Sequence, residues 1–282
     1  MKFGLHISIS GPLINVIERA VFLGCDTLQI FTRNPRSWAS PKDYSQEDIS
    51  AFKKGLKKRR IEPLVIHIPY LPNFATPSAN LIEKSVHMLV SDLKWAEKLS
   101  ASYLVIHPGK HIGSGIDIGI QRIIESIDIA FSVSKNKVQL LLENTAGQGT
   151  EVGVRLEELK AIIDGCEQPE RIGVCLDLCH LYMAGYDIRD RLDETLETVD
   201  NIIGLSKVKL LHGSDCKAGC GSHLDRHEHI GKGKIGQEGF ERIVNHPLLY
   251  QLPLILETPK KEEDDDLRNM ARIRSFIKKR ES

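Results

Sequence analysis

Two segments of the chain share the pattern Leu-Val-Ile-His: Pro63-Leu64-Val65-Ile66-His67-Ile68 and Tyr103-Leu104-Val105-Ile106-His107-Pro108. Each is a short apolar run rich in β-branched residues, which is typical of a buried strand. Residues 80–99, between them, have the apolar spacing of an amphipathic helix. A strand, a helix and a second strand in this order predict a βαβ unit with parallel strands.

The same alternation runs along the whole chain. Apolar runs lie at residues 2–8, 27–31, 63–68, 103–108, 138–145, 172–177, 207–213 and 253–258. Helical patterns follow them at residues 13–23, 46–59, 80–99, 116–134, 155–164, 189–203, 239–244 and 266–279. Eight strands, each followed by a helix, predict an α/β fold in which residues 1–282 form one (β/α)8 TIM barrel. An open doubly wound sheet is disfavoured because the chain carries no nucleotide fingerprint.

A glycine-rich segment at residues 231–236 is the nearest approach to a phosphate-binding loop. It lacks Gly-Lys-Ser/Thr and does not follow a predicted strand, so a P-loop is disfavoured. We predict a tight turn or a flexible loop instead.

The composition, 41% hydrophobic and 27% charged, is that of a soluble globular protein. No run approaches the roughly 20 apolar residues of a membrane span, and the first residues lack a signal-peptide profile. We therefore expect a cytoplasmic protein with no membrane partner. The six cysteines form no Cys-x-x-Cys pair and are expected to be reduced core or loop residues.

The charge balance argues at first against a nucleic-acid partner. Lys and Arg together number 38, as do Asp and Glu, so the bare chain offers no overall positive field to a polyanion. The argument weakens if carboxylates bind divalent cations, because positive charge is then concentrated at one site.

Six successive predicted strands end in a residue type that binds metals: His67, His107, Glu143, Asp177, His212 and Glu257. In a barrel the C-terminal strand ends open onto one face, so these side chains should converge. One buried histidine or carboxylate more often serves a hydrogen-bond network. Six together would bury several unpaired charges, which is costly without a cation. The pattern predicts a polynuclear metal site.

Two local patterns, Asp177-x-x-His180 and Asp225-x-His227, add further candidate ligands. Imidazole with carboxylate and no thiolate suits zinc, with manganese or iron as substitutes, and favours a catalytic cluster over a structural one. Other histidines, including His6, are expected to be core or surface residues.

Six ordered motifs, spread over nearly the whole chain, resemble those of the endonuclease IV family, the zinc-dependent apurinic/apyrimidinic endonucleases of family 2. They are His67-Ile68-Pro69-Tyr70-Leu71, His107-Pro108-Gly109-Lys110-His111, Leu142-Glu143-Asn144-Thr145-Ala146-Gly147-Gln148-Gly149, Asp177-Leu178-Cys179-His180, Asp225-Arg226-His227-Glu228-His229-Ile230-Gly231-Lys232-Gly233 and Leu256-Glu257-Thr258-Pro259.

The resemblance implies a barrel that binds three zinc ions per chain. Glu143 would bridge two of them. The ligand sets would be His67 and His107 with Glu143 for the first ion, Asp177, His212 and Glu257 with Glu143 for the second, and His180, Asp225 and His227 for the third. Glu143 and Glu257 are the residues expected to be catalytic.

The implied activity is DNA repair by base excision. A zinc-held hydroxide would hydrolyse the phosphodiester 5′ to an abasic site in double-stranded DNA, leaving a 3′-hydroxyl and a 5′-deoxyribose phosphate, and 3′-blocking groups would also be removed. Arg36 in the loop 32–38, and Tyr70 with Leu71, match family positions that enter DNA at the lesion. Their alternatives are an exposed loop arginine and a tyrosine packed over the rim. A monomer is expected.

Two other functions stay open. One is a metal-dependent sugar isomerase or epimerase of similar barrel type, which would share the strand-end ligands but use one or two metals. Ligands for a third metal, His180, Asp225 and His227, distinguish the endonuclease from such an enzyme. The second alternative is a non-catalytic barrel that binds DNA and only recognises the lesion.

Overall fold

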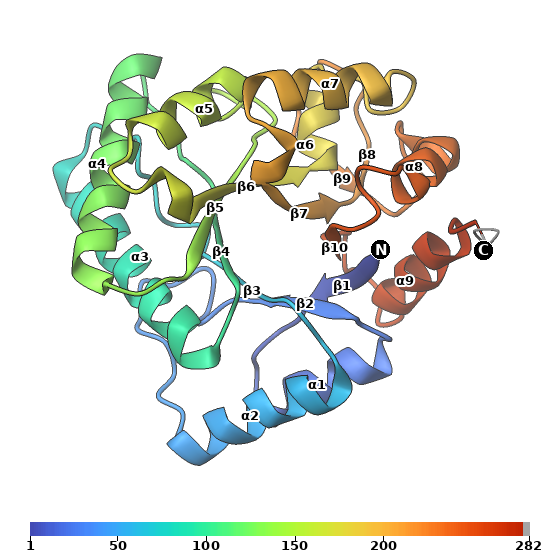
Figure 1. Ribbon diagram of the computed structural model, residues 1–282, viewed down its shortest axis with the longest axis horizontal. Helices are drawn as coiled ribbons and strands as arrows, with labels where there is room; N and C mark the ends of the chain where they lie inside the picture. Colours follow the sequence, from blue (N-terminus) through green and yellow to red (C-terminus); the bar gives the residue numbers. More distant parts are fainter. Residues whose placement is uncertain (279–282) are drawn as a thin grey trace.

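Eight parallel strands close into a barrel in the order β1-β10-β7-β6-β5-β4-β3-β2. The computed structural model describes residues 1–278. In Figure 1 the strands form a central ring and the helices lie outside it. The predicted single-domain (β/α)8 barrel is confirmed, because each strand pairs in parallel with its neighbours and the ring has no open edge.

Each predicted apolar run contains one barrel strand. The barrel strands are β1 (Lys2–His6), β2 (Thr27–Ile30), β3 (Leu64–His67), β4 (Tyr103–Ile106), β5 (Gln139–Glu143), β6 (Ile172–Asp177), β7 (Val208–Gly213) and β10 (Pro253–Leu256). An additional antiparallel pair, β8 (Asp215–Cys216) and β9 (His227–Glu228), was not predicted. Strands of two residues are too short to give a periodic pattern.

The helices are α1 (Ile14–Phe22), α2 (Gln46–Arg59), α3 (Ala79–Leu99), α4 (Ile116–Ser134), α5 (Leu156–Gly165), α6 (Leu178–Met183), α7 (Leu192–Ile202), α8 (Gly236–Asn245) and α9 (Asp265–Ser275), with short 3₁₀ helices at Pro169–Arg171 and Leu205–Lys207. The last predicted helix ran to residue 279, which lies outside the described residues. Within residues 1–278, none of the helices is both long and apolar enough to cross a membrane.

Helix α6 is the element that the periodicity missed. All six of its residues are buried, so it has no polar face to reveal a helical repeat. The next helix, α7, begins at Leu192, three residues after the predicted start, because a turn in which Asp187 accepts the backbone N–H groups of Arg189 and Asp190 precedes it.

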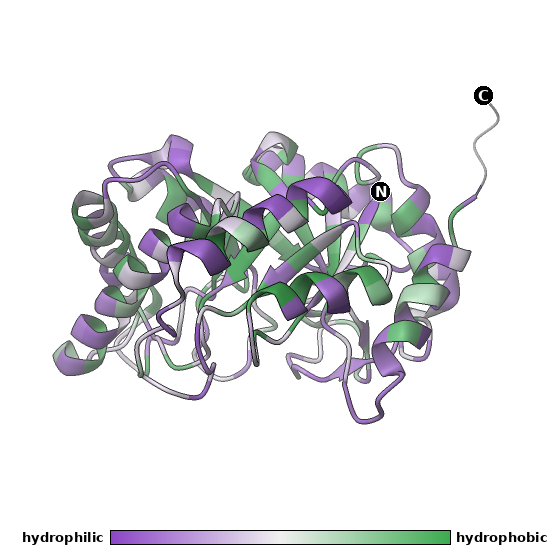
Figure 2. Cartoon of the chain, turned by 90° about the horizontal axis from the view of Figure 1, so that it is seen from below, coloured by the Kyte–Doolittle hydropathy of each residue, from purple (hydrophilic) through white to green (hydrophobic). Residues whose placement is uncertain are grey.

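The apolar residues form two layers. Inside the barrel, a cluster contains one residue from each of six strands: Val65, Val105, Leu141, Cys175, Leu210 and Ile255. The larger core lies between the strands and the surrounding helices. Figure 2 shows hydrophilic residues along the outer helix faces and the loops. We call the six-residue set the interior cluster.

The two ends of the chain meet where the barrel closes. Strand β1 pairs with β10 from Lys2 opposite Pro253 to Leu5 opposite Leu256, and α9 lies beside β1 in Figure 1. Arg274 of α9 places its guanidinium 5.2 Å from the centroid of the Phe3 ring and binds Asp26 at 2.7 Å. The last helix therefore fastens the first strand.

Candidate metal centre

The six strand-end residues lie two positions after the members of the interior cluster on six of the eight barrel strands. Side chains two apart on a strand point to the same side, here into the barrel. The pairs are Val65 and His67, Val105 and His107, Leu141 and Glu143, Cys175 and Asp177, Leu210 and His212, and Ile255 and Glu257. Six polar groups are thereby gathered at the C-terminal rim, above an apolar floor.

Glu143 lies at the centre of this rim and is fully buried. Its Oε2 is 3.1 Å from His67 Nε2 and 3.3 Å from His107 Nε2, and its Oε1 is 3.1 Å from His212 Nδ1. Burial alone would raise the pKa of Glu143, but the neighbouring His107 and His212 outweigh it and hold that pKa well below its usual range. An ionised carboxylate shared by three imidazoles is the result.

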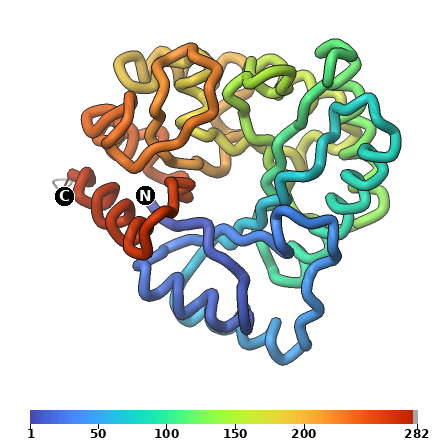
Figure 3. The backbone as a smooth tube through the Cα atoms, turned by 180° about the vertical axis from the view of Figure 1, so that it is seen from behind, coloured from blue at the N-terminus to red at the C-terminus, as the bar shows by residue number. Residues whose placement is uncertain are grey.

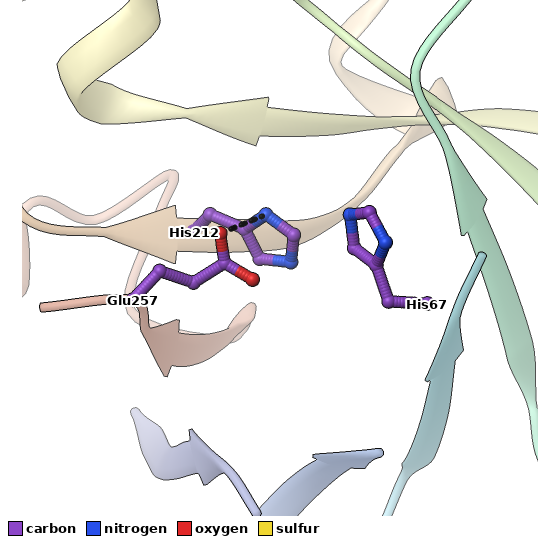
Figure 4. A group of neighbouring side chains, drawn as sticks. All are labelled: His67, His212 and Glu257. Carbon is purple, nitrogen blue, oxygen red and sulfur yellow. Dashed lines mark ion pairs between the residues drawn. The ribbon is translucent and has the colours of Figure 1, made fainter. Parts of the chain in front are cut away.

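Two groups of ligand atoms share Glu143. His67, His107 and Glu143 offer atoms that all lie within 4.8 Å of one another, and so do Glu143, Asp177, His212 and Glu257. In Figure 4 the rings of His67 and His212 face each other, and Glu257 lies beside His212. Their ring centroids are 5.8 Å apart.

The donor set fits a divalent cation such as zinc. It consists of imidazole nitrogens and carboxylate oxygens, which are zinc's ordinary ligands beside thiolates. Asp177 Oδ2 is buried and has no hydrogen-bond partner among residues 1–278. A buried carboxylate oxygen without a partner is rare and costly, and a cation would satisfy it.

A third group consists of His180, Asp225 and His227, whose ligand atoms also lie within 4.8 Å of one another. Asp225 Oδ1 is 3.5 Å from His180 Nε2 and 3.2 Å from His227 Nε2. His180 is buried on α6, where the carboxylate of Asp177 accepts its backbone N–H at 2.7 Å as the helix N-cap. The end of β6 and the start of α6 thus act as one unit.

Protonation differs between the groups. Burial tends to lower the pKa of His227, but its hydrogen bond with Asp225 outweighs burial and raises that pKa to about 10. Asp177 similarly raises the pKa of His180 well above its usual value against the effect of burial. For His107, in contrast, burial dominates and lowers the pKa. Without an ion, the third group holds protons at neutral pH that His107 does not.

A thiol that was not among the predicted ligands, that of Cys179, lies beside this third group. Asp177, Cys179 and His227 offer atoms within 4.8 Å of one another. The Cys179 thiol is fully buried and donates to Met183 Sδ at 3.7 Å. Five of the six cysteines are buried and Cys220 is exposed, with all six described as free thiols.

The connection that carries Asp225 and His227, drawn in orange in Figure 3, is fastened by Asp215. Burial raises the pKa of the Asp215 carboxyl, and its hydrogen bonds to the backbone offset part of that effect. The carboxylate accepts four backbone N–H groups at 2.8–3.1 Å, those of Cys216, Gly233, Ile235 and Gly236. A Cβ at Gly233 would lie 2.3 Å from the Cys216 carbonyl oxygen, so glycine is required there.

The glycine-rich segment 231–236 is therefore a tight turn, the first of the two predicted alternatives. It wraps around the Asp215 carboxylate and leads directly into α8.

A cleft of about 1620 Å³ opens over the rim. Its lining includes ligand candidates from all three groups, namely His107, His180, Asp225, His227 and Glu257. Cationic side chains gather around it, namely Arg36, Lys42, Lys110, Arg226 and Lys260. The cleft therefore joins candidate metal sites to groups that attract anions.

Arg36, Tyr70 and Leu71 all line the wall of this cleft. Arg36 is exposed, and the Tyr70 side chain, 66% exposed, meets the Phe31 ring at a centroid distance of 5.4 Å. The Tyr70 backbone N–H donates to the Pro35 carbonyl at 3.3 Å, which joins the loop after β2 to the loop after β3.

A buried ion pair attaches the loop after β2 to helix α3. The Arg33 guanidinium binds the Asp92 carboxylate of α3, and Thr32 Oγ1 donates to the same oxygen at 2.6 Å. Both charged groups are buried, so the start of the loop is rigidly placed.

Strands β1 and β2 also place polar side chains at the rim, those of His6 and Gln29, and neither was predicted to belong to the site. Gln29 is fully buried on β2, with its Nε2 2.6 Å from Glu257 Oε1 and 3.0 Å from His6 Nδ1. Burial lowers the pKa of His6, on β1, to about 4. One signal was present: Gln29 is a lone amide inside the apolar run 27–31, at a position that faces the barrel interior.

Comparison with known proteins identifies the family. Residues 17–280 match the model of the xylose isomerase-like TIM barrel family. "Probable endonuclease 4" of Halothermothrix orenii is 47% identical over 277 residues, which cover 96% of this chain and 99% of that protein. The chain belongs to the endonuclease IV family. The protein of the same name from Methanoculleus marisnigri is 44% identical over 97% of this chain and 98% of its own.

Solved structures agree with this membership. Endonuclease IV from Thermus thermophilus superposes with a TM-score of 0.88 at 36% identity, and 98% of each chain is covered. A D-tagatose 3-epimerase-like protein gives a TM-score of 0.72 at 21% identity over 98% of this chain and 97% of its own, which shows a shared fold alone. The resemblance based on the six motifs is confirmed.

Proposed function

We propose that the chain is a metal-dependent DNA-repair endonuclease that hydrolyses the phosphodiester 5′ to an abasic site in double-stranded DNA. The products would be a 3′-hydroxyl and a 5′-deoxyribose phosphate, and 3′-blocking groups would also be removed. The observation that supports this is the position of three groups of His and carboxylate ligand atoms at the base of a cleft with cationic walls. We further propose that it acts in the cytoplasm as a monomer.

Three zinc ions per chain are proposed, with Mn²⁺ or Fe²⁺ as substitutes. The proposed ligand sets are His67, His107 and Glu143, then Glu143, Asp177, His212 and Glu257, and finally His180, Asp225 and His227. Glu143 is the shared ligand because both of its oxygens already face imidazoles, Oε2 those of His67 and His107 and Oε1 that of His212.

When bound, such ions lower the pKa of a water toward ~7 and stabilise negative charge on a phosphate. The chain's own residues do the positioning. The buried Glu143 carboxylate contacts the histidines of the first two groups. Glu257 lines the cleft, and its side chain is 20% exposed. The cationic wall would hold the phosphates that flank the reacting one. The formal net charge of zero describes the protein without metal ions, and three divalent ions would add roughly +6 to it.

The wall residues Arg36, Tyr70 and Leu71 would contact the DNA at the lesion. Extruding or bending a nucleotide is cheaper where a base is already missing, and side chains on the wall of the cleft can fill the vacated stack. This role is supported by their position, because all three residues line the same cleft as the candidate ligand Glu257.

The deciding experiment is a nicking assay on a duplex with one tetrahydrofuran abasic analogue. We expect cleavage 5′ to the analogue, loss of cleavage with EDTA, and recovery with added zinc. The undamaged duplex of the same sequence is the control. Binding without EDTA-sensitive nicking would favour the non-catalytic lesion-binding alternative and overturn the enzyme proposal. Fewer than two ions per chain after zinc loading would favour the sugar isomerase or epimerase alternative.

Arg36→Ala tests the DNA contacts separately. We expect weaker binding of the abasic duplex, because an exposed cation that fills the lesion is lost, with zinc content unchanged. Binding measured by fluorescence anisotropy at one fixed salt concentration checks it. Lys137→Ala, at the pocket beside α4 that the proposed function does not use, is the matched control. Wild-type affinity and rate in Arg36→Ala would remove this residue from the proposed interface.

A further inference from the structure

Gln29 bridges two candidate ligands of the same ion from a strand that supplies none. Its Nε2 is 2.6 Å from Glu257 Oε1, and its Oε1 is 2.9 Å from His212 Nε2. The side chain is fully buried on β2, whereas His212 lies on β7 and Glu257 follows β10. One amide therefore spans three strands of the rim.

The partners of this amide fix its orientation. An ionised carboxylate only accepts hydrogen bonds, so the NH₂ group of Gln29 must face Glu257. The amide oxygen then faces His212, and an amide oxygen only accepts. His212 Nε2 must therefore carry the hydrogen. The second N–H of the same NH₂ group reaches His6 Nδ1 at 3.0 Å, so both donors of the amide are used.

The consequence falls on the other ring nitrogen of His212. A neutral imidazole has one N–H and one lone pair, and the partner of one nitrogen decides the role of the other. In the neutral ring that a metal ligand requires, an Nε2 that donates to Gln29 leaves the lone pair on Nδ1, which is 3.1 Å from Glu143 Oε1 and 3.7 Å from Glu257 Oε2. Nδ1 is thus the nitrogen that points into the ligand group.

We propose that Gln29 is a positioning residue of the metal centre, which sets the tautomer of His212 and restrains the Glu257 carboxylate so that both face one ion. The inference rests on the proposed function for the presence of that ion. Groups that orient metal ligands in this way commonly change metal affinity by roughly 10- to 100-fold when they are removed.

The test compares three variants loaded with zinc. Gln29→Met is apolar and similar in length, so it removes both contacts. Gln29→Glu keeps an acceptor for His212 but places a carboxylate against Glu257. Thr27→Val is the matched control, since Thr27 is equally buried on the same strand and loses one hydrogen bond, from Oγ1 to the Pro63 carbonyl at 2.6 Å.

Zinc retention is measured by competition with a chelating dye. We expect Gln29→Met to bind one ion per chain roughly 10- to 100-fold more weakly than wild type, and Thr27→Val to match wild type. Wild-type affinity in Gln29→Met, or an equal loss in Thr27→Val, would overturn the proposal. Circular dichroism verifies that each variant is folded, and if Gln29→Met does not fold, Gln29→Glu decides by the same criterion.

A second readout reports the tautomer. Zinc-loaded protein labelled with ¹⁵N at histidine should show one imidazole with a protonated Nε2 and a zinc-bound Nδ1, absent from His212→Gln. The same imidazole signal should still be present in Gln29→Glu, because that side chain keeps an acceptor for His212 Nε2. A zinc-bound Nε2 at His212 in wild type would refute the inference. Nicking is assayed in parallel: failure of wild type to nick refutes the proposed function, while zinc retention and the spectrum still decide the role of Gln29.

Discussion

The candidate ligands fall into two sets that are held in different ways. The strand set, His67, His107, Glu143, Asp177, His212 and Glu257, is placed by the barrel, each residue two positions beyond the interior cluster. The flank set, His180, Asp225 and His227, stands on a short helix and a long connection. Glu143 and His212 are fully buried, whereas the side chains of His227 and Asp225 are 20% and 42% exposed.

The difference lies in what each set depends on. Moving a strand-set residue requires a change in the register of a closed sheet, which would disturb every neighbour. In the flank set, His180 Nδ1 and His227 Nδ1 lie 3.0 and 2.9 Å from the backbone carbonyl oxygens of Asn144 and Glu257. Its other supports are the N-cap bond of α6, the two-stranded β8–β9 pair and the hydrogen bonds of Asp215, and none of these contacts is a strand pairing of the closed barrel. We therefore expect the flank site to be the weaker and more adjustable of the two.

The largest effect should come from Glu143→Gln. One carboxylate oxygen becomes an amide nitrogen and the negative charge is lost, while both oxygens face imidazoles. Both strand-set sites should therefore lose affinity, and nicking should fall by more than ~100-fold, which exceeds the effect of changing a residue that is not itself a ligand. Metal analysis and the abasic nicking assay measure it. Activity near wild type would show that Glu143 is not the shared ligand.

Asp225→Asn should affect one ion only. The amide still accepts through its oxygen but loses the charge that His180 and His227 share. We expect roughly 10- to 100-fold weaker binding of one ion per chain with the other two retained, by zinc titration against a chelator. Glu228→Gln, on the adjacent β9, should leave all three in place. Equal loss of every ion would mean that the two sets are not independent.

Asp215→Asn should loosen the connection that carries Asp225 and His227 without changing a candidate ligand. An amide nitrogen would meet backbone N–H groups that now face a carboxylate, which should destabilise the fold by roughly 1–3 kcal/mol. Urea unfolding measures this change. Zinc binding should weaken at one site per chain, and uniform loss at all sites would contradict the separation.

The smallest effect should be a pH dependence of the metal-free protein. The pKa of His227 is raised from 6.5 to about 10, so its contribution to stability is fully present below about 6.5 and is lost as pH rises through about 10. Asp225 stays ionised across this window because His180 and His227 lower its pKa.

We expect His227→Gln to destabilise EDTA-treated protein by about 1 kcal/mol at pH 6, since Asp225 is partly screened by water, and by less at pH 10. Urea unfolding at the two pH values gives the difference. A penalty that grew with pH would reverse the assigned sign.

The sequence predicted the barrel because its strands are buried on both faces, so each is a continuous apolar run that stands out from the amphipathic helices. His67 and Glu143 could be picked out because each is a polar residue that directly follows such an apolar run. The elements that were missed are short or lack a polar face, as in β8, β9 and α6, and these are set by tertiary contacts such as the Asp215 hydrogen bonds.

Within the rim, Gln29 and His6 were missed for a different reason. Neither is a strand-end ligand in the motifs, and their role depends on the stagger between strands that are distant in sequence. His212 and Gln29 are 183 residues apart, and only closure of the barrel brings their side chains to 2.9 Å. A pattern along one strand does not contain that information.

Closure of the barrel also sets the order in which the centre can be made. During synthesis the first candidate ligand, His67, emerges long before the last, Glu257, and β10 must enter between β1 and β7 before the ring exists. An unfinished chain has the early ligands but no closed rim. The group that contains Glu257 can therefore be assembled only after the last strand has been made and has closed the ring, whereas the other two groups have all their ligands earlier in the chain.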